Sequence, residues 1–194
     1  ELRQRGKGDF LITVGSQILM NSKAQRSETA LGKLGCYRLK NHPNPRVLVG
    51  GLGMGITLRA VLDELPDTAQ VIVAELNPKI HQWCLEFLSE LTGGAASDSR
   101  VTVEIADVAE LIRKAPKASF DAIILDLYRG PGPQTDQQND PIYGSHAIAC
   151  SYAALKPGGT FAIWGENPDT GFEKRLASGG FTPVSYTHLR AHET

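Results

Sequence analysis

The sequence predicts an α/β fold: a doubly wound, mostly parallel sheet with helices on both faces. Short, continuously apolar segments alternate along the chain with longer segments whose apolar residues recur at helical spacing. Segments without polar interruption are typical of strands in a parallel sheet that is buried on both sides. The strands expected from this pattern are residues 46–49, 70–74, 101–105, 120–125, 160–164 and 181–184, and the helices are residues 58–65, 78–91, 108–115, 144–155 and 168–178.

Local signals support the individual elements. The helix over residues 58–65 carries its leucines and its valine at i, i+3, i+4 and i+7. Pro78 begins the next helix, whose apolar face includes Phe87 and runs to Leu91. The Lys-Pro-Gly-Gly run over residues 156–159 ends the helix before it.

A different pattern precedes this alternation. The apolar runs 9–14 and 17–20 flank Gly15-Ser16, which predicts a β-hairpin, and a segment of helical character follows over residues 27–39. The breaker cluster His42-Pro-Asn-Pro45 marks a boundary. We therefore divide the chain into three parts: a hairpin and helix segment (1–43), a Rossmann-like nucleotide-binding domain (44–184) and a tail (185–194).

The two ends of the chain suggest a fragment. It begins at Glu1 rather than Met, and residues 185–194 show no apolar period. We expect these ten residues to be a non-native tail, resembling a translated sequencing adapter, and the C-terminal strand of the sheet to be truncated. His188 and His192 are four residues apart, but no third ligand lies nearby in the sequence, so we expect no metal site.

Composition excludes two classes of partner. The chain has 20 Lys and Arg against 21 Asp and Glu, so there is no basic excess for a nucleic acid. Its apolar runs are far shorter than the ~20 residues that span a bilayer. Cys36, Cys84 and Cys150 lie far apart and are interpreted as free thiols in a reducing, cytoplasmic compartment.

The ends of the first two strands carry the signature of a nucleotide site. Gly51, Gly53 and Gly55 follow the strand over residues 46–49 and precede a helix, so the backbone can approach a ligand closely beside free amides. Glu75 follows the next strand, 24 positions after Gly51, where a carboxylate accepts hydrogen bonds from ribose hydroxyls.

Carboxylates also follow the third and fourth strands. Asp107 can cap the helix that begins at Val108, and it can accept a hydrogen bond from an adenine amine; the two roles are compatible. Asp126 ends the apolar strand 120–125, beside the nucleotide site, where a carboxylate is well placed for acid–base chemistry. The polar segment from Leu127 to about Pro141 is expected to be a lid.

Four segments occur together in a fixed order: Val47-Leu-Val-Gly-Gly-Leu-Gly-Met-Gly55, Val73-Ala-Glu-Leu-Asn-Pro78, Phe120-Asp-Ala-Ile-Ile-Leu-Asp126 and Leu155-Lys-Pro-Gly-Gly159. This set resembles the spermidine synthase family, the polyamine aminopropyltransferases, which share the class I methyltransferase fold. The resemblance covers residues 9–184, including the hairpin, since the family carries a small β-domain before its sheet.

The resemblance implies roles for individual residues. Glu75 and Asp107 would hold the ribose and the adenine of decarboxylated S-adenosylmethionine or S-adenosylmethionine, and Asp126 would activate an attacking amine. We also expect Leu76 and Val108 to contact the nucleotide, and Tyr128, Arg129 and Tyr143 to contact the acceptor. The implied partner is a small amine or other nucleophile, and a homodimer is left open as the assembly.

One position departs from the family pattern. The family reads D-x-x-D-P-x-G-P, and Arg129 stands where the second aspartate, which helps to hold the diamine, would be. A guanidinium there repels a cationic polyamine and attracts an anion. Three hypotheses therefore stay open: an aminopropyltransferase of polyamine biosynthesis, an S-adenosylmethionine-dependent methyltransferase, and a non-catalytic nucleotide-binding paralogue.

Overall fold

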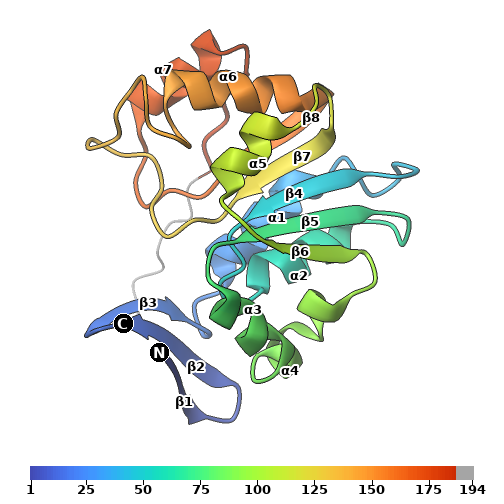
Figure 1. Ribbon diagram of the computed structural model, residues 1–194, viewed down its shortest axis with the longest axis vertical. Helices are drawn as coiled ribbons and strands as arrows, with labels where there is room; N and C mark the ends of the chain where they lie inside the picture. The colour runs from blue at the N-terminus through green and yellow to red at the C-terminus, as the bar shows by residue number, and fades with distance from the viewer. Residues whose placement is uncertain (187–194) are drawn as a thin grey trace.

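The computed structural model of the protein describes residues 1–186. Its larger sheet has five strands, and each neighbouring pair is parallel (Figure 1). The order across the sheet is β6-β5-β4-β7-β8, which confirms the predicted doubly wound topology. The strands are β4 (Arg46–Gly50), β5 (Gln70–Glu75), β6 (Val101–Ile105), β7 (Phe120–Leu125) and β8 (Leu155–Ile163).

Alternate residues of each strand pack into two separate cores, one on each face of the sheet. In β4, Val47 and Val49 face a core shared with α1 (Arg26–Cys36) and α2 (Ile56–Glu64), while Leu48 faces the other. That second core is covered by three helices, which lie together on one side of the sheet in Figure 1. They are α5 (Val108–Lys114), α6 (Ser145–Ala154) and α7 (Thr170–Ser178).

A small antiparallel sheet precedes the parallel one. The predicted hairpin is present as β2 (Asp9–Val14) and β3 (Gln17–Asn21), which are paired antiparallel. A further strand that the sequence did not predict, β1 (Leu2–Gly6), pairs with β2. Its sequence, Leu-Arg-Gln-Arg-Gly, has one apolar residue and no alternation, because β1 is an edge strand whose side chains are mostly exposed.

The helix predicted over residues 78–91 is wrong in its length. The chain forms α3 (Pro78–Leu85), leaves helical geometry at Glu86, and resumes with α4 (Ser89–Thr92) and the 3-10 turn η1 (Ala95–Ser97). The break turns Leu88 fully into the core and leaves Phe87 59% exposed, although both fit one apolar helical face. Burying Leu88 within the core that packs on this face of the sheet therefore determines the path of the chain here.

The C-terminal part of the described chain also differs from expectation. Residues 181–184 form no strand: the Phe181 N–H bonds to Leu176 at the end of α7, and Pro183 has no N–H to offer a ladder. The ring of Phe181 packs against Phe161 and Tyr152 instead. Strand β8 begins at Leu155, earlier than predicted, and residues 156–159 form an irregularity in its pairing with β7.

Two further sequence predictions concern membrane-spanning segments and the C-terminal tail. None of the helices within residues 1–186 is both long and apolar enough to cross a membrane. His188 and His192 lie outside the described residues, as does most of the predicted tail.

Candidate active site

The candidate site lies where the chain order of the parallel sheet reverses. Strands β4 and β7 are neighbours there, and their carboxyl ends are joined by a hydrogen bond of 2.9 Å from the Asp126 N–H to the Gly50 carbonyl. Ligands of doubly wound sheets bind in the crevice outside such a switch point. The predicted glycine loop and the predicted catalytic carboxylate are therefore brought together by one pair of adjacent strands.

The glycine loop needs its glycines at specific positions. Gly51 has a φ of +87°, and a side-chain carbon there would overlap the Asp126 carbonyl oxygen. A side-chain carbon at Gly53, where φ is +52°, would lie 2.6 Å from the sulfur of Met20 on β3. The loop thus passes close to β7 on one side and to the N-terminal sheet on the other.

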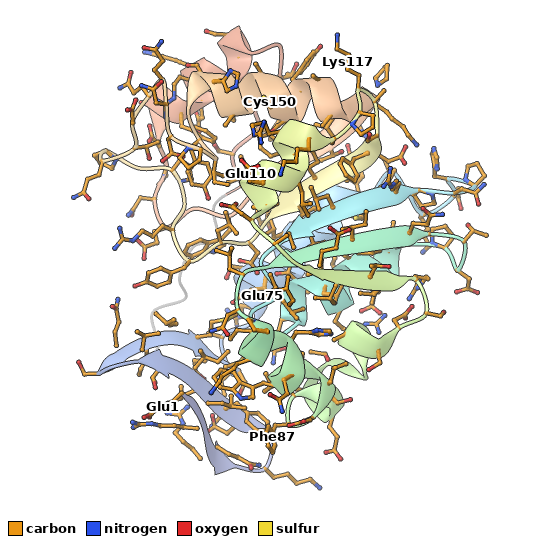
Figure 2. The ribbon with its side chains drawn as sticks, viewed as in Figure 1. Glu1, Glu75, Phe87, Glu110, Lys117 and Cys150 are labelled. Atoms are coloured by element: carbon orange, nitrogen blue, oxygen red, sulfur yellow. The ribbon has the colours of Figure 1, made fainter. Side chains whose placement is uncertain are left out.

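Glu75 holds this loop in place from the end of β5. One oxygen of its carboxylate accepts the Leu52 N–H at 3.0 Å, and the other accepts the Asn77 N–H at 2.9 Å. Figure 2 shows Glu75 at the edge of the parallel sheet, on the side of the N-terminal strands. Each carboxylate oxygen can accept more than one hydrogen bond, so ribose hydroxyls can still donate to Glu75.

Asp107 caps helix α5, as the capping interpretation predicts. Its Oδ1 accepts the Ala109 N–H at 2.9 Å, and the side chain is otherwise exposed. Val108 is buried beneath the glycine loop, with its methyl groups next to Gly50. Leu76 is 70% exposed and offers apolar surface just beyond Glu75. Capping uses one oxygen of Asp107, which leaves the other free for a ligand.

Asp126 is the carboxylate at this edge of the sheet whose pKa is clearly shifted. Burial raises the pKa of Asp126 to about 6; a hydrogen bond from Thr57 opposes that rise and the negative charge of Glu28 adds to it. The Thr57 hydroxyl donates to Asp126 Oδ2 at 2.5 Å. A carboxylate with a pKa near 6 is ionised at neutral pH and is a stronger base than an ordinary aspartate.

The predicted acceptor residues gather around the loop that follows Asp126. The Tyr128 hydroxyl accepts a hydrogen bond of 2.7 Å from Gln17 on β3, and the Arg129 guanidinium lies 5.8 Å from the centre of the Tyr128 ring. Tyr143 is buried, and its hydroxyl donates to the Arg129 carbonyl at 2.8 Å. Tyr143 thus contacts the backbone of the loop after β7, while the side chains of Tyr128 and Arg129 are exposed.

Sequence reasoning missed three side chains that complete this site. Gln17 and Met20 reach it from β3, and Thr57 reaches it from the first turn of α2. The sequence offers one signal for Thr57: it is a polar residue near the start of a helix whose sheet-facing residues are otherwise apolar. No pattern in the sequence indicates that the hairpin lies over the glycine loop.

Comparison with known proteins identifies the family. The spermine/spermidine synthase domain matches residues 32–174 of this chain. The chain belongs to that family. The polyamine aminopropyltransferase 1 of Hyperthermus butylicus is 34% identical over 121 residues, which cover 61% of this chain and 40% of that protein. The putrescine N-methyltransferase 3 of Nicotiana tabacum is 32% identical over 126 residues, covering 64% of this chain and 31% of that protein.

The fold agrees with this assignment. The spermidine synthase of Thermotoga maritima superposes with a TM-score of 0.67 at 27% identity, over 87% of this chain and 56% of that structure. The predicted fold, with its small β-element before a Rossmann-like sheet, is thereby confirmed. The matches span 40% or less of the two curated relatives.

Proposed function

We propose that the protein is a spermidine synthase-like transferase that binds an adenosyl sulfonium nucleotide and transfers an aminopropyl group from it to an amine. The observation that carries the proposal is the adjacency of the glycine loop and Asp126 at the switch point of the sheet. Decarboxylated S-adenosylmethionine is the co-substrate that the family relationship favours.

The chain's own residues account for binding of the nucleotide. Glu75 is placed to accept the ribose hydroxyls, and the exposed oxygen of Asp107 to accept the adenine amine. The free amides and positive end of α2 lie behind the glycine loop. The exposed Leu76 supplies apolar surface next to Glu75, whereas the buried Val108 supports the glycine loop from beneath.

The reaction requires one proton transfer that Asp126 can perform. The amine nitrogen attacks the carbon next to the sulfonium, the carbon–sulfur bond breaks with its electron pair going to sulfur, and the nitrogen becomes cationic. An alkylamine is nucleophilic only when deprotonated, and its unperturbed pKa is near ~10.4. Asp126 orients the amine and takes its proton as the carbon–nitrogen bond forms.

Arg129 favours a second candidate function. Its guanidinium stacks on Tyr128, and no carboxylate among residues 1–186 pairs with it. A cation at this point suits the carboxylate that intact S-adenosylmethionine retains, so a methyltransferase is the alternative. A non-catalytic paralogue is disfavoured because it has no use for a half-buried carboxylate with a raised pKa such as Asp126. A cytoplasmic location and a homodimer remain predictions from the sequence.

The direct test is calorimetry with decarboxylated and intact S-adenosylmethionine side by side, followed by product analysis with a panel of amines. The proposal predicts tighter binding of the decarboxylated form and an aminopropylated product together with methylthioadenosine. A methylated product and adenosylhomocysteine would establish the methyltransferase. Binding without any product would establish the non-catalytic paralogue.

A further inference from the structure

Thr57 occupies an unusual place for a hydroxyl group. It is the second residue of α2, directly behind the glycine loop, and only 2% of it is exposed. Its hydroxyl does not cap its own helix, whose N-cap is Gly55. Instead it donates to Asp126, which lies 69 positions further along the chain. A buried hydroxyl requires a partner, and its single proton goes to Asp126 Oδ2 at 2.5 Å rather than to the Glu28 carbonyl oxygen, which lies 3.5 Å away.

The packing of two helices fixes where this hydroxyl points. Gly32 of α1 lies so close to α2 that a side-chain carbon there would stand 2.7 Å from the Cβ of Ala60 and 2.9 Å from the carbonyl oxygen of Thr57. The backbone of Thr57 is therefore held against α1. Threonine on a helix divides between two χ1 rotamers, and the short hydrogen bond to Asp126 selects the one in which the hydroxyl points at Oδ2.

The hydrogen bond distinguishes the two oxygens of Asp126. Oδ2 accepts from Thr57, and Asp126 makes no other side-chain hydrogen bond within the described residues. We propose that Thr57 is the positioning residue of the reaction: it fixes Oδ2, so that Oδ1 is the oxygen that takes the proton from the acceptor amine. This inference rests on the proposed function and adds to it the atom at which the proton is received.

The charged and titratable groups around Asp126 give the proposal a pH signature. The negative charge of Glu28 on α1 acts on Asp126, and the charge of Asp126 in turn contributes to the raised pKa of the buried Tyr143. Hydrogen bonding to a carboxylate favours its ionised form. Thr57 therefore lowers the pKa of Asp126, opposing both burial and the negative charge of Glu28.

The experiment compares Thr57→Val, which removes the hydroxyl at nearly constant shape, with Thr57→Ser, which keeps it. Thr57→Ala replaces the valine variant if that one does not fold. The matched control is Thr13→Val, because Thr13 is also buried and its hydroxyl has no hydrogen-bond partner within residues 1–186. Turnover and the nucleotide KM are measured from pH 5 to pH 9. The titration of the Asp126 carboxyl carbon is followed by NMR in aspartate-labelled protein, with Asp126→Asn to assign the signal.

Thr57→Val should move the acidic limb of turnover and the NMR titration upward together by about one pH unit. Turnover would then fall about tenfold at pH 5 and little at pH 9. The nucleotide KM should not change, and Thr57→Ser and Thr13→Val should both behave as the unmodified chain does.

Two outcomes would overturn the proposal. One is an unchanged NMR titration of Asp126 in Thr57→Val. The other is a loss of turnover that is equal at every pH and is not restored by serine, which would indicate a purely structural role. The NMR measurement does not depend on activity. If the unmodified chain transfers nothing, the proposed function fails, while the titration still decides whether Thr57 controls Asp126.

Discussion

The two halves of the candidate site are built in different ways. On the nucleotide side, carboxylates at strand ends accept backbone N–H groups two positions further along the chain: Glu75 accepts from Asn77, and Asp107 accepts from Ala109. On the acceptor side, side chains meet that are far apart in the chain, since 111 positions separate Gln17 from Tyr128. Turn chemistry thus determines the first half, and tertiary packing determines the second. The acceptor side can therefore change without disturbing the nucleotide side.

The largest expected effect is on the acceptor side, at Asp126. Asp126→Asn keeps the shape of the side chain and removes its charge, so turnover should fall by ~10²–10⁴ if Asp126 is the base. Nucleotide affinity should change much less, because Glu75 and Asp107 are the residues that we propose to bind the ribose and the adenine. Steady-state kinetics and calorimetry on the same preparation would separate the two effects. An undiminished turnover number would remove Asp126 from the chemistry.

On the nucleotide side, a substitution should weaken nucleotide binding more than Asp126→Asn does. Glu75→Ala removes an ionised acceptor, a loss on the order of 1.5–3 kcal/mol, or about 10–150-fold in affinity. It also releases the glycine loop, because the Leu52 N–H loses its partner. Calorimetry with decarboxylated S-adenosylmethionine would measure the change. Glu90→Ala, at an exposed position on α4, is the control that should bind normally, and equal affinities in the two variants would place the ribose elsewhere.

The difference between the two halves also explains which elements and residues could be predicted from the sequence. Strands 101–105 and 120–125 match β6 and β7 to the residue. The buried strand β7 is recognisable as a nearly continuous apolar run, and the edge strand β6 by its alternation of apolar and polar residues. Glu75 and Asp107 follow from counting positions after strands. Gln17, Met20 and Thr57 could not be predicted, since each acts on a segment that only folding brings near. The break at Glu86 was missed for a related reason: burial of Leu88 overrides helical periodicity.

Asp126 should also lower the stability of the folded chain at pH values where its carboxylate is ionised. Its pKa is raised from 3.8 to about 6, so the folded state prefers the protonated form. Protonation of Asp126 makes its full contribution to the free energy of unfolding below pH ~3.8. That contribution is lost as the pH rises through about 6. Asp126→Asn should therefore be more stable than the unmodified chain at pH 8, by about 1–2 kcal/mol once partial exposure is considered.

Urea denaturation at pH 8 and pH 5 measures this difference. The advantage of the asparagine variant should shrink at the lower pH, because part of the unmodified carboxylate is then protonated in the folded state. An advantage that grows on acidification would mean that the carboxylate is stabilised, not destabilised, by its surroundings.

The smallest expected effect is at Arg129, where the account departs from an ordinary spermidine synthase. The exposed guanidinium lies beside Tyr128 and places positive charge near any diammonium acceptor. Arg129→Asp should improve the use of putrescine by about tenfold. The matched control is Arg38→Asp, because Arg38 lies over Tyr37 in the same way, just after the end of α1.

The measurement that tests the central claim most directly is aminopropyl transfer from decarboxylated S-adenosylmethionine to putrescine, at matched salt, by the unmodified chain, Arg129→Asp and Arg38→Asp. We expect all three to bind the nucleotide equally, the unmodified chain and Arg38→Asp to use putrescine poorly, and Arg129→Asp to use it about tenfold better. Efficient transfer to putrescine by the unmodified chain would contradict this expectation, and would mean that the acceptor side works as in a spermidine synthase despite Arg129.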